Sequence, residues 1–251
     1  MNLYELETHL NQLLNIGKFR DYGPNGLQVE GRAEVQKIVT GVSATQELLD
    51  AAVELNADAV LVHHGYFWKN ESPVIRGMKK RRIATLLKHD ISLFGYHLPL
   101  DAHPELGNNA QLAKLLGIQN EGVMDERELQ GVGNIGSLPE PQSLEAFGKH
   151  VANVLGREPL LISAGDQPIR RIAWCTGGAQ GYIQQAFDLG MDAYLSGEIS
   201  EHTVHSAREN GIHYIAAGHH ATERYGIKAL GEYLAKTFGF EHLFLDLNNP
   251  A

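Results

Sequence analysis

Histidines and carboxylates near the ends of strand-like runs are the residues of this sequence that could do chemistry. The chain has 13 histidines in 251 residues, and several of them follow apolar runs typical of buried strands: His63, His64, His97, His219 and His220. Asp101 and Glu223 lie close to them in the sequence. Neutral imidazole and carboxylate together suit divalent zinc, manganese, iron, cobalt or nickel, whereas the single cysteine cannot build a thiolate site. The sequence therefore predicts a metal site.

The spacing of these residues indicates how they could share ions. His219 and Glu223 lie on one face if a helix begins there, because residues four apart on a helix are neighbours. His63 and His64 are adjacent, and at a strand end they could address two different ions. Asp101 and Glu223 each have two oxygens and could bridge such a pair. Two metals about 3.5–4 Å apart with a water between them recur in hydrolytic enzymes, so the pattern favours a dinuclear centre.

Other candidate residues carry a weaker signal. His97 and His220 have the pattern of residues that orient ligands as well as that of ligands. Cys175 falls inside a probable strand, where a small buried hydrophobe is the simpler interpretation than a nucleophile. The glycine-rich stretch 177–181 follows the same strand but matches neither a dinucleotide fingerprint nor a P-loop, so a tight turn is expected there.

These side chains require strands that bring them to one edge of a sheet. The runs 37–42 and 59–62 read as buried strands, and the segment 46–55 between them reads as a helix capped by Ser43 or Thr45. Such a βαβ unit is right-handed and produces a parallel sheet. Ligands of open α/β sheets bind outside the carboxyl ends of the strands, which is where His63 and His64 fall.

The βαβ pattern recurs in the second half of the chain. The segment 171–195 corresponds to 37–61, and in each half a further strand, 91–96 or 212–217, leads to a His-x-x-x-carboxylate motif. We therefore expect an α/β protein of two pseudo-repeated halves with mostly parallel β-strands, 1–125 completed by the C-terminal segment and 126–251. Gly197-Glu198 occupies the place in the second half that His63-His64 occupies in the first.

The composition restricts the class of protein and partner. The formal net charge of −9 and pI near 5.8 give no general attraction to nucleic acid or anionic lipid. One cysteine excludes an intramolecular disulfide and fits a reducing cytoplasm. The N-terminal segment lacks the features of a secretory signal, and no run approaches membrane-spanning length. We expect a soluble, cytoplasmic protein that binds neither membrane nor, by default, nucleic acid.

Taken together, six motifs resemble those of the Nif-three-like family, whose members are commonly labelled GTP cyclohydrolase I type 2 homologues. They are YGPNGLQV at 22–29, HHG at 63–65, HLPLD at 97–101, NN at 108–109, SGE at 196–198 and GHHATE at 218–223. The resemblance implies a Nif-three-like fold and two divalent metal ions per chain, with no organic cofactor. It places the metal ligands on His63, His64, Asp101, His219 and Glu223. It also implies a toroidal homohexamer with the metal sites facing an interior cavity.

Two functional hypotheses follow. The first is a metal-dependent hydrolase acting on a small molecule such as a nucleotide or damaged nucleotide; in its cyclohydrolase version, a metal-activated water opens a purine ring at C8 and formate is released. His97 or Glu198 is then the candidate for proton transfer. The alternative is a non-catalytic interaction or regulatory protein that the metals stabilise. The many ionisable groups around the ligands favour chemistry, because a purely structural site needs fewer of them.

Overall fold

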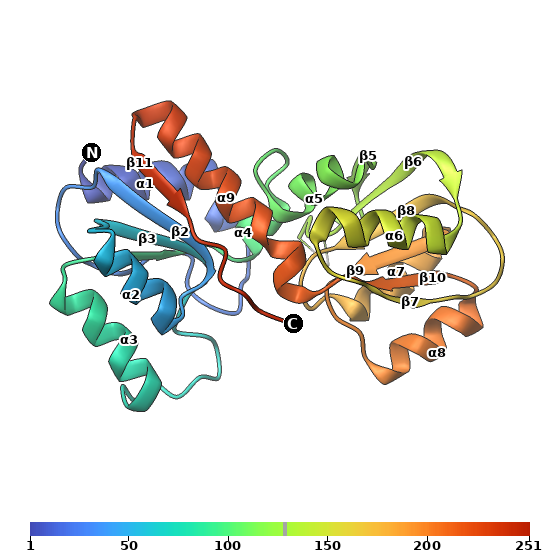
Figure 1. Ribbon diagram of the computed structural model, residues 1–251, viewed down its shortest axis with the longest axis horizontal. Helices are drawn as coiled ribbons and strands as arrows, with labels where there is room; N and C mark the ends of the chain where they lie inside the picture. The colour runs from blue at the N-terminus through green and yellow to red at the C-terminus, as the bar shows by residue number, and fades with distance from the viewer. Residues whose placement is uncertain (128–129) are drawn as a thin grey trace. The chain divides into compact units, whose positions relative to one another are not determined.

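The protein is a mixed α/β molecule with two sheets, as the sequence predicts. The computed structural model describes residues 1–127 and 130–251. The described chain divides into two compact units (Figure 1). The first unit comprises Met1–Leu100 and Gly226–Asn248, and the second comprises Asp101–Tyr225 and Asn249–Ala251.

The first unit is built on a five-stranded sheet of order β1-β4-β3-β2-β11. Its strands are β1 (Gly26–Val29), β2 (Lys37–Ser43), β3 (Ala59–His64), β4 (Ser92–Gly95) and β11 (Glu241–Phe244). Its helical elements are α1 (Leu3–Leu13), the 3₁₀ turn η1 (Ile16–Lys18), α2 (Gln46–Glu54), α3 (Gly77–Lys88) and most of α9 (His219–Phe238). Neighbouring strands run parallel except β1, which is antiparallel to β4. In Figure 1 the red β11 lies beside the blue β2, so the last strand of the chain completes the first sheet.

Local sequence explains why these elements form. Thr45 caps α2 by accepting a hydrogen bond from the Leu48 backbone N–H, as expected of a capping hydroxyl. The runs at β2 and β3 are almost wholly buried, which fits strands covered on both faces. Apolar side chains of both strands and of α2 pack into one core with Leu93. The sheet thereby presents the end of β3, with His63 and His64, at a fixed edge.

The second unit is built on a six-stranded sheet of order β5-β6-β8-β9-β10-β7. Its strands are β5 (Gln119–Val123), β6 (Asn134–Gln142), β7 (Leu160–Ile162), β8 (Ile169–Cys175), β9 (Ala193–Ser196) and β10 (His213–Ala216). Its helical elements are α5 (Asn108–Leu116), α6 (Leu144–Leu155), the 3₁₀ turn η2 (Gln180–Tyr182), α7 (Ile183–Asp188) and α8 (Glu201–Asn210). Only the centre of this sheet, β8-β9-β10, is parallel, and β5, β6 and β7 join it antiparallel.

The two units divide at Leu100/Asp101, whereas the sequence pattern predicts two halves that meet after residue 125. Packing explains the position of the division. Leu112, Ala113 and Leu116 of α5 lie in the same buried cluster as Phe147 and Trp174, so α5 belongs to the core of the second unit. The segment 226–248 belongs to the first unit, since β11 pairs with β2.

The chain passes between the units inside two helices that carry candidate site residues. The short helix α4 (Leu98–Ala102) contains the passage at Leu100/Asp101, directly after His97. The passage at Tyr225/Gly226 falls inside α9, which begins at His219 and includes Glu223. Each His-x-x-x-carboxylate motif therefore lies at or just before a point where the chain leaves one unit and enters the other.

Several predicted elements are confirmed within the described residues. The helix expected at 46–55 appears as α2, and the helix expected after His219 appears as α9. None of the described helices combines the length and apolar character needed to cross a membrane.

Candidate metal-binding residues

In the first unit, two candidate ligands occupy the last two positions of β3. His63 is fully buried, and its Nδ1 lies 2.9 Å from the carbonyl oxygen of Tyr96. His64 is partly exposed, and its Nδ1 lies 3.0 Å from the hydroxyl oxygen of Ser43. A ring held at Nδ1 presents Nε2 as the coordinating nitrogen, which is the usual arrangement of metal-binding histidine.

His97 lies beside this pair and is clamped by a carboxylate. Its Nδ1 is 2.6 Å from Oδ1 of Asp21, whose side chain is 2% exposed. Asp21 also accepts a hydrogen bond from the backbone N–H of Leu98, and Asn25 accepts one from the backbone N–H of His97. Burial alone would raise the pKa of Asp21, but hydrogen bonding and charge attraction from His97 lower it overall. Asp21 is therefore held as a carboxylate.

The loop before β1 supplies this clamp. Gln28 of β1 donates to the carbonyl of Pro24 and accepts from the backbone N–H of Tyr66. A Cβ on Gly65 would lie 2.2 Å from Oε1 of Gln28, so a larger residue after the histidine pair would displace the Gln28 side chain from its hydrogen bonds. The signal for this role was the dense polar motif at 21–31, which contained no metal ligand type apart from its carboxylates.

In the second unit, Asp101 is held by side chains from two other elements. Its Oδ1 accepts hydrogen bonds from Asn108 Nδ2 at 2.8 Å and from Thr176 Oγ1 at 3.2 Å. Asn109 donates to the backbone carbonyl of Asp101 and accepts from the backbone N–H of Thr176. Asp101 is 5% exposed. These contacts fix the carboxylate and explain why the pair Asn108-Asn109 accompanies it.

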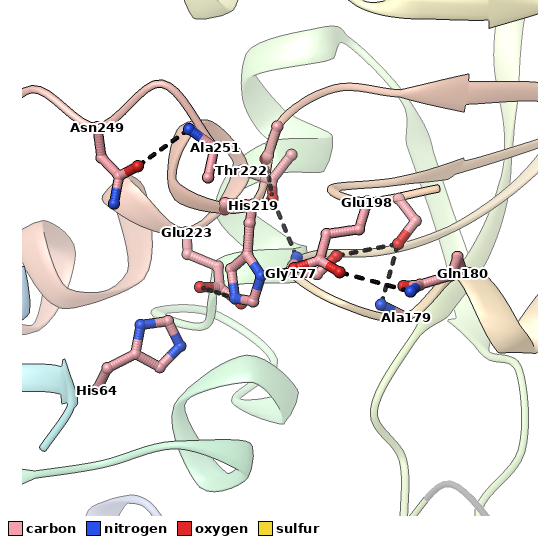
Figure 2. A network of polar contacts seen from close by, with 12 residues as sticks. His64, Gly177, Ala179, Gln180, Glu198, His219, Thr222, Glu223, Asn249 and Ala251 are labelled. Atoms are coloured by element: carbon pink, nitrogen blue, oxygen red, sulfur yellow. Dashed lines mark hydrogen bonds and ion pairs between the residues drawn. The ribbon is translucent and has the colours of Figure 1, made fainter. Parts of the chain in front are cut away.

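His219 lies between two carboxylates in the same unit (Figure 2). Its Nδ1 is 2.7 Å from Glu198 Oε1, and its Nε2 is 3.2 Å from Glu223 Oε2. Burial would lower the pKa of His219, but hydrogen bonding and attraction from Glu223 and Glu198 outweigh it and raise the pKa to about 9. The prediction that His219 and Glu223 share one helix face is confirmed. Asp101 and Glu223 also offer oxygens within 4.8 Å of each other.

Gly177 forms a tight cradle for Glu223. Its φ is +69°, and a Cβ there would lie 2.0 Å from Glu223 Oε1. Its backbone N–H donates to Thr222 Oγ1 at 3.1 Å, which ties the loop after β8 to the first turn of α9 (Figure 2). The glycine-rich stretch is therefore a close turn against a candidate ligand.

The remaining sequence candidates have other surroundings. The backbone N–H of His220 donates to the carbonyl of Ala251, and His220 belongs to none of the groups of described residues with metal-ligand geometry. Glu198 is half-exposed and reaches His219, and its own carboxylate also accepts from Gln180. Cys175 is buried in β8 with a raised pKa caused by burial.

The family model for Duf34/NIF3 (NGG1p interacting factor 3) matches residues 1–250 of the chain. The chain belongs to the NIF3 family. The NIF3 relatives include proteins named GTP cyclohydrolase 1 type 2 homolog from Pseudomonas aeruginosa, 62% identical over 99% of this chain and 98% of the relative, and from Escherichia coli K12, 56% identical over 98% of each.

Solved structures agree with this NIF3 assignment. A structural-genomics protein titled ybgI, of unknown function, has a TM-score of 0.96 at 55% identity and covers all of both chains. The protein TTHA1606 from Thermus thermophilus has a TM-score of 0.89 at 33% identity, again over all of both chains. The Nif-three-like fold expected from the sequence motifs is therefore confirmed.

The donor set fits a divalent metal ion. Imidazole nitrogens gather in the first unit, where His63, His64 and His97 offer ligand atoms within 4.8 Å of one another. Carboxylate oxygens and an imidazole gather in the second. Nitrogen and oxygen donors of this kind suit zinc, manganese, iron, cobalt or nickel, and the hydrogen bonds behind the rings are those that orient metal ligands.

Proposed function

We propose that this NIF3 protein is a dinuclear-metal-dependent hydrolase of a small molecule. His63, His64, Asp101, His219 and Glu223 are the proposed ligands of two divalent ions. The observation that carries this proposal is the set of hydrogen bonds that orient the ligand side chains. Imidazole Nδ1 atoms of His63, His64 and His219 and one oxygen of Asp101 are each engaged by a protein group. Such outer contacts are typical of metal ligands whose orientation matters for function.

The chemistry of such a centre is hydrolytic. Two bound divalent ions supply an activated water and stabilise the negative charge that develops in the reaction. His97 and Glu198 are the proposed proton-transfer residues at the edge of the metal centre. Their side chains are 19% and 46% exposed, so both can exchange protons with solvent. Asp21 holds the His97 ring in one orientation, and the His219–Glu198 contact gives a path from a ligand to solvent.

The proposed substrate class is a nucleotide or damaged nucleotide. The support is the name shared by close relatives, GTP cyclohydrolase 1 type 2 homolog. Hydrolytic opening of a purine ring needs an activated water and a proton donor, and the proposed centre provides both. The alternative, a metal-stabilised interaction protein, requires the ions but no turnover.

Metal analysis and an activity panel test the proposal. Wild-type protein should retain about two ions per chain after gel filtration, and Glu223→Gln should lose most of them, whereas Glu201→Gln, an exposed glutamate at the start of α8, should not. Unchanged metal content in Glu223→Gln would contradict the ligand assignment. Nucleotides and phosphoesters should then be assayed with manganese, nickel, cobalt or zinc. Metal binding without turnover in any condition would favour the interaction protein.

A further inference from the structure

We propose that the exposed ring of Tyr22 is a stacking surface for the planar heterocycle of a nucleotide that enters beside His97. This inference rests on the proposed function and adds to it a residue that recognises the substrate. It concerns recognition of the base rather than metal binding, and every residue that it uses belongs to the first unit.

The ring of Tyr22 is exposed although its backbone is fixed. Tyr22 is 58% exposed. Its backbone N–H donates to Asp21 Oδ1 at 2.6 Å, and its carbonyl accepts from the backbone N–H of Lys69 at 2.6 Å. The Asp21 carboxylate also contacts His97, so the loop is held at both ends of this residue. A tyrosine on a fixed backbone gives a large contact area at a small cost in conformational entropy, because only its side-chain torsions remain to be ordered.

Trp68 joins the loop of Tyr22 to the segment that follows β3. Its indole Nε1 donates to the carbonyl of Gly65 at 3.1 Å, which fixes the indole just after the histidine pair. A Cβ on Gly23 would lie 3.2 Å from Cε3 of Trp68, so the residue after Tyr22 rests directly against the indole. The position of Tyr22 is therefore tied to the end of the strand that carries the candidate ligands.

Both aromatic rings meet His97 without stacking on it. The ring centroid of Tyr22 lies 6.0 Å from that of His97 at an interplanar angle of 66°, and that of Trp68 lies 5.0 Å away at 86°. The His97 contact thus leaves ring surface of Tyr22 open, as its exposure requires. Aromatic rings pair in offset-stacked as well as edge-to-face arrangements. A planar heterocycle stacked on Tyr22 would lie beside His97, the proposed proton-transfer residue.

The charges around Tyr22 favour an anionic ligand. The segments 18–28 and 65–70 contain three exposed cations, namely Lys18, Arg20 and Lys69. Their one acidic residue is Asp21, whose side chain is buried against His97. The chain as a whole has a formal net charge of −9, so this excess of positive charge is local. A nucleotide fits both features, because its base can stack and its phosphate is attracted to the cations.

Binding of 2-aminopurine riboside 5′-monophosphate tests this inference, because the fluorescence of this base falls when it stacks on an aromatic ring. The protein as purified should quench the probe. Tyr22→Ala should weaken binding about 5–150-fold, the range expected when a base loses one aromatic stacking partner. Tyr22→Phe should bind as wild type does because it keeps the ring, whereas Tyr22→Leu should resemble Tyr22→Ala.

Tyr4→Ala is the matched control for these variants. Tyr4 is 53% exposed and belongs to the same unit, and its hydroxyl donates to Glu30. It should bind the probe as wild type does. Thermal unfolding checks that each variant is folded.

Competitors identify the part of the nucleotide that Tyr22 recognises. GMP and ribose 5-phosphate both carry a phosphate, but only GMP carries a base. Tyr22→Ala should lose affinity for GMP within the same range and keep its affinity for ribose 5-phosphate. Equal losses for the two competitors would overturn the stacking role, because the residue would then act on the sugar or the phosphate.

The outcomes separate this inference from the proposed function. Absence of quenching by wild-type protein, or equal affinities of wild type and Tyr22→Ala, would overturn the inference while loss of metal in Glu223→Gln kept the proposed ligands. A changed elution volume of Tyr22→Ala in gel filtration with unchanged quenching would also overturn it, since the ring would then serve a contact between subunits. Tyr22-dependent quenching without turnover of any substrate would support the inference and count against a hydrolase.

Discussion

At the scale of single residues, the candidate ligands depend on neighbours that are not ligands. Gly177 and Glu198 illustrate two kinds of support, one steric and one electrostatic. Gly177 leaves room for the Glu223 carboxylate, and Glu198 accepts the hydrogen bond that orients His219. Both can be tested without changing a proposed ligand.

Substitution of Gly177 should damage metal binding through steric contact. Gly177→Ala places a Cβ 2.0 Å from Glu223 Oε1, so the carboxylate must move. Gly156→Ala is the control, because Gly156 has a φ of +67° and nothing within 4 Å of its Cβ position. Both variants should lose about 1–2 kcal/mol of stability from the left-handed backbone. Only Gly177→Ala should lose metal in elemental analysis; equal metal content in the two variants would contradict the cradle.

Removal of Glu198 should weaken binding without abolishing it. Glu198→Ala deletes the acceptor 2.7 Å from His219 Nδ1 and leaves the ligand itself intact. Loss of such a contact typically costs about 10–100-fold in metal affinity. Competition with a chromogenic chelator measures the change, with Glu201→Ala as the exposed control. Identical affinities in these two variants would show that the contact has no role.

At the scale of elements, β11 shows how a late strand stabilises an early sheet. It pairs with β2, and Thr40 of β2 lies 2.8 Å from Nε2 of His242 in β11. Gly231 of α9 lies against the same ring, where a Cβ would approach Nε2 to 2.1 Å. Burial lowers the pKa of His242 below its ordinary value of 6.5, and this outweighs the opposing attraction of Glu232.

Acid should therefore weaken the attachment of β11. The unfolded chain binds a proton at His242 more readily than the folded chain does, so stability is fully present above pH about 6.5 and is lost as pH falls toward the lowered pKa. Thermal unfolding of chelated protein should show a smaller decrease in midpoint between pH 7.5 and pH 5 for His242→Gln than for wild type. An equal decrease in both proteins would exclude His242 as a cause.

Elements that form because of their own local sequence can be predicted from it, whereas elements that depend on distant partners cannot. The helix expected at 46–55 and the strands expected at 37–42 and 59–62 were predictable because their apolar pattern and caps are local. β5 is mostly exposed, and β11 is half-buried, so neither has a strong apolar signal. Their strand character comes from pairing with β6 and β2, which no local pattern encodes.

The candidate site was predictable to the same extent. Histidines and carboxylates after strands are visible in the sequence because metal chemistry restricts the residue types. The contacts of Asp21 with His97 and of Thr176 with Asp101 join residues far apart in the chain. They depend on tertiary packing, and Asp and Thr in loops have many other uses, so spacing alone could not identify them.

At the scale of the whole molecule, the first unit is discontinuous in sequence. Met1–Leu100 and Gly226–Asn248 share one sheet, and Leu245 and Leu247 pack against the core that Val39 and Val60 help to form. A fragment of residues 1–100 should therefore remain protease-sensitive and lack a cooperative thermal transition. Co-expression with a peptide covering 219–248 should restore both properties. Cooperative folding of the isolated fragment would contradict this dependence.

The discontinuity has a consequence for synthesis on the ribosome. Domains usually fold as they emerge, N-terminal part first, at about 5–20 residues per second. Here the first sheet cannot be completed until β11 is translated, after the whole intervening unit has been made. During that interval of roughly 10–40 seconds, the edge of β2 stays unpaired and open to other nascent chains. The sheet whose synthesis begins first is thus completed only near the end of translation, and its exposed edge is where chaperone protection would matter most.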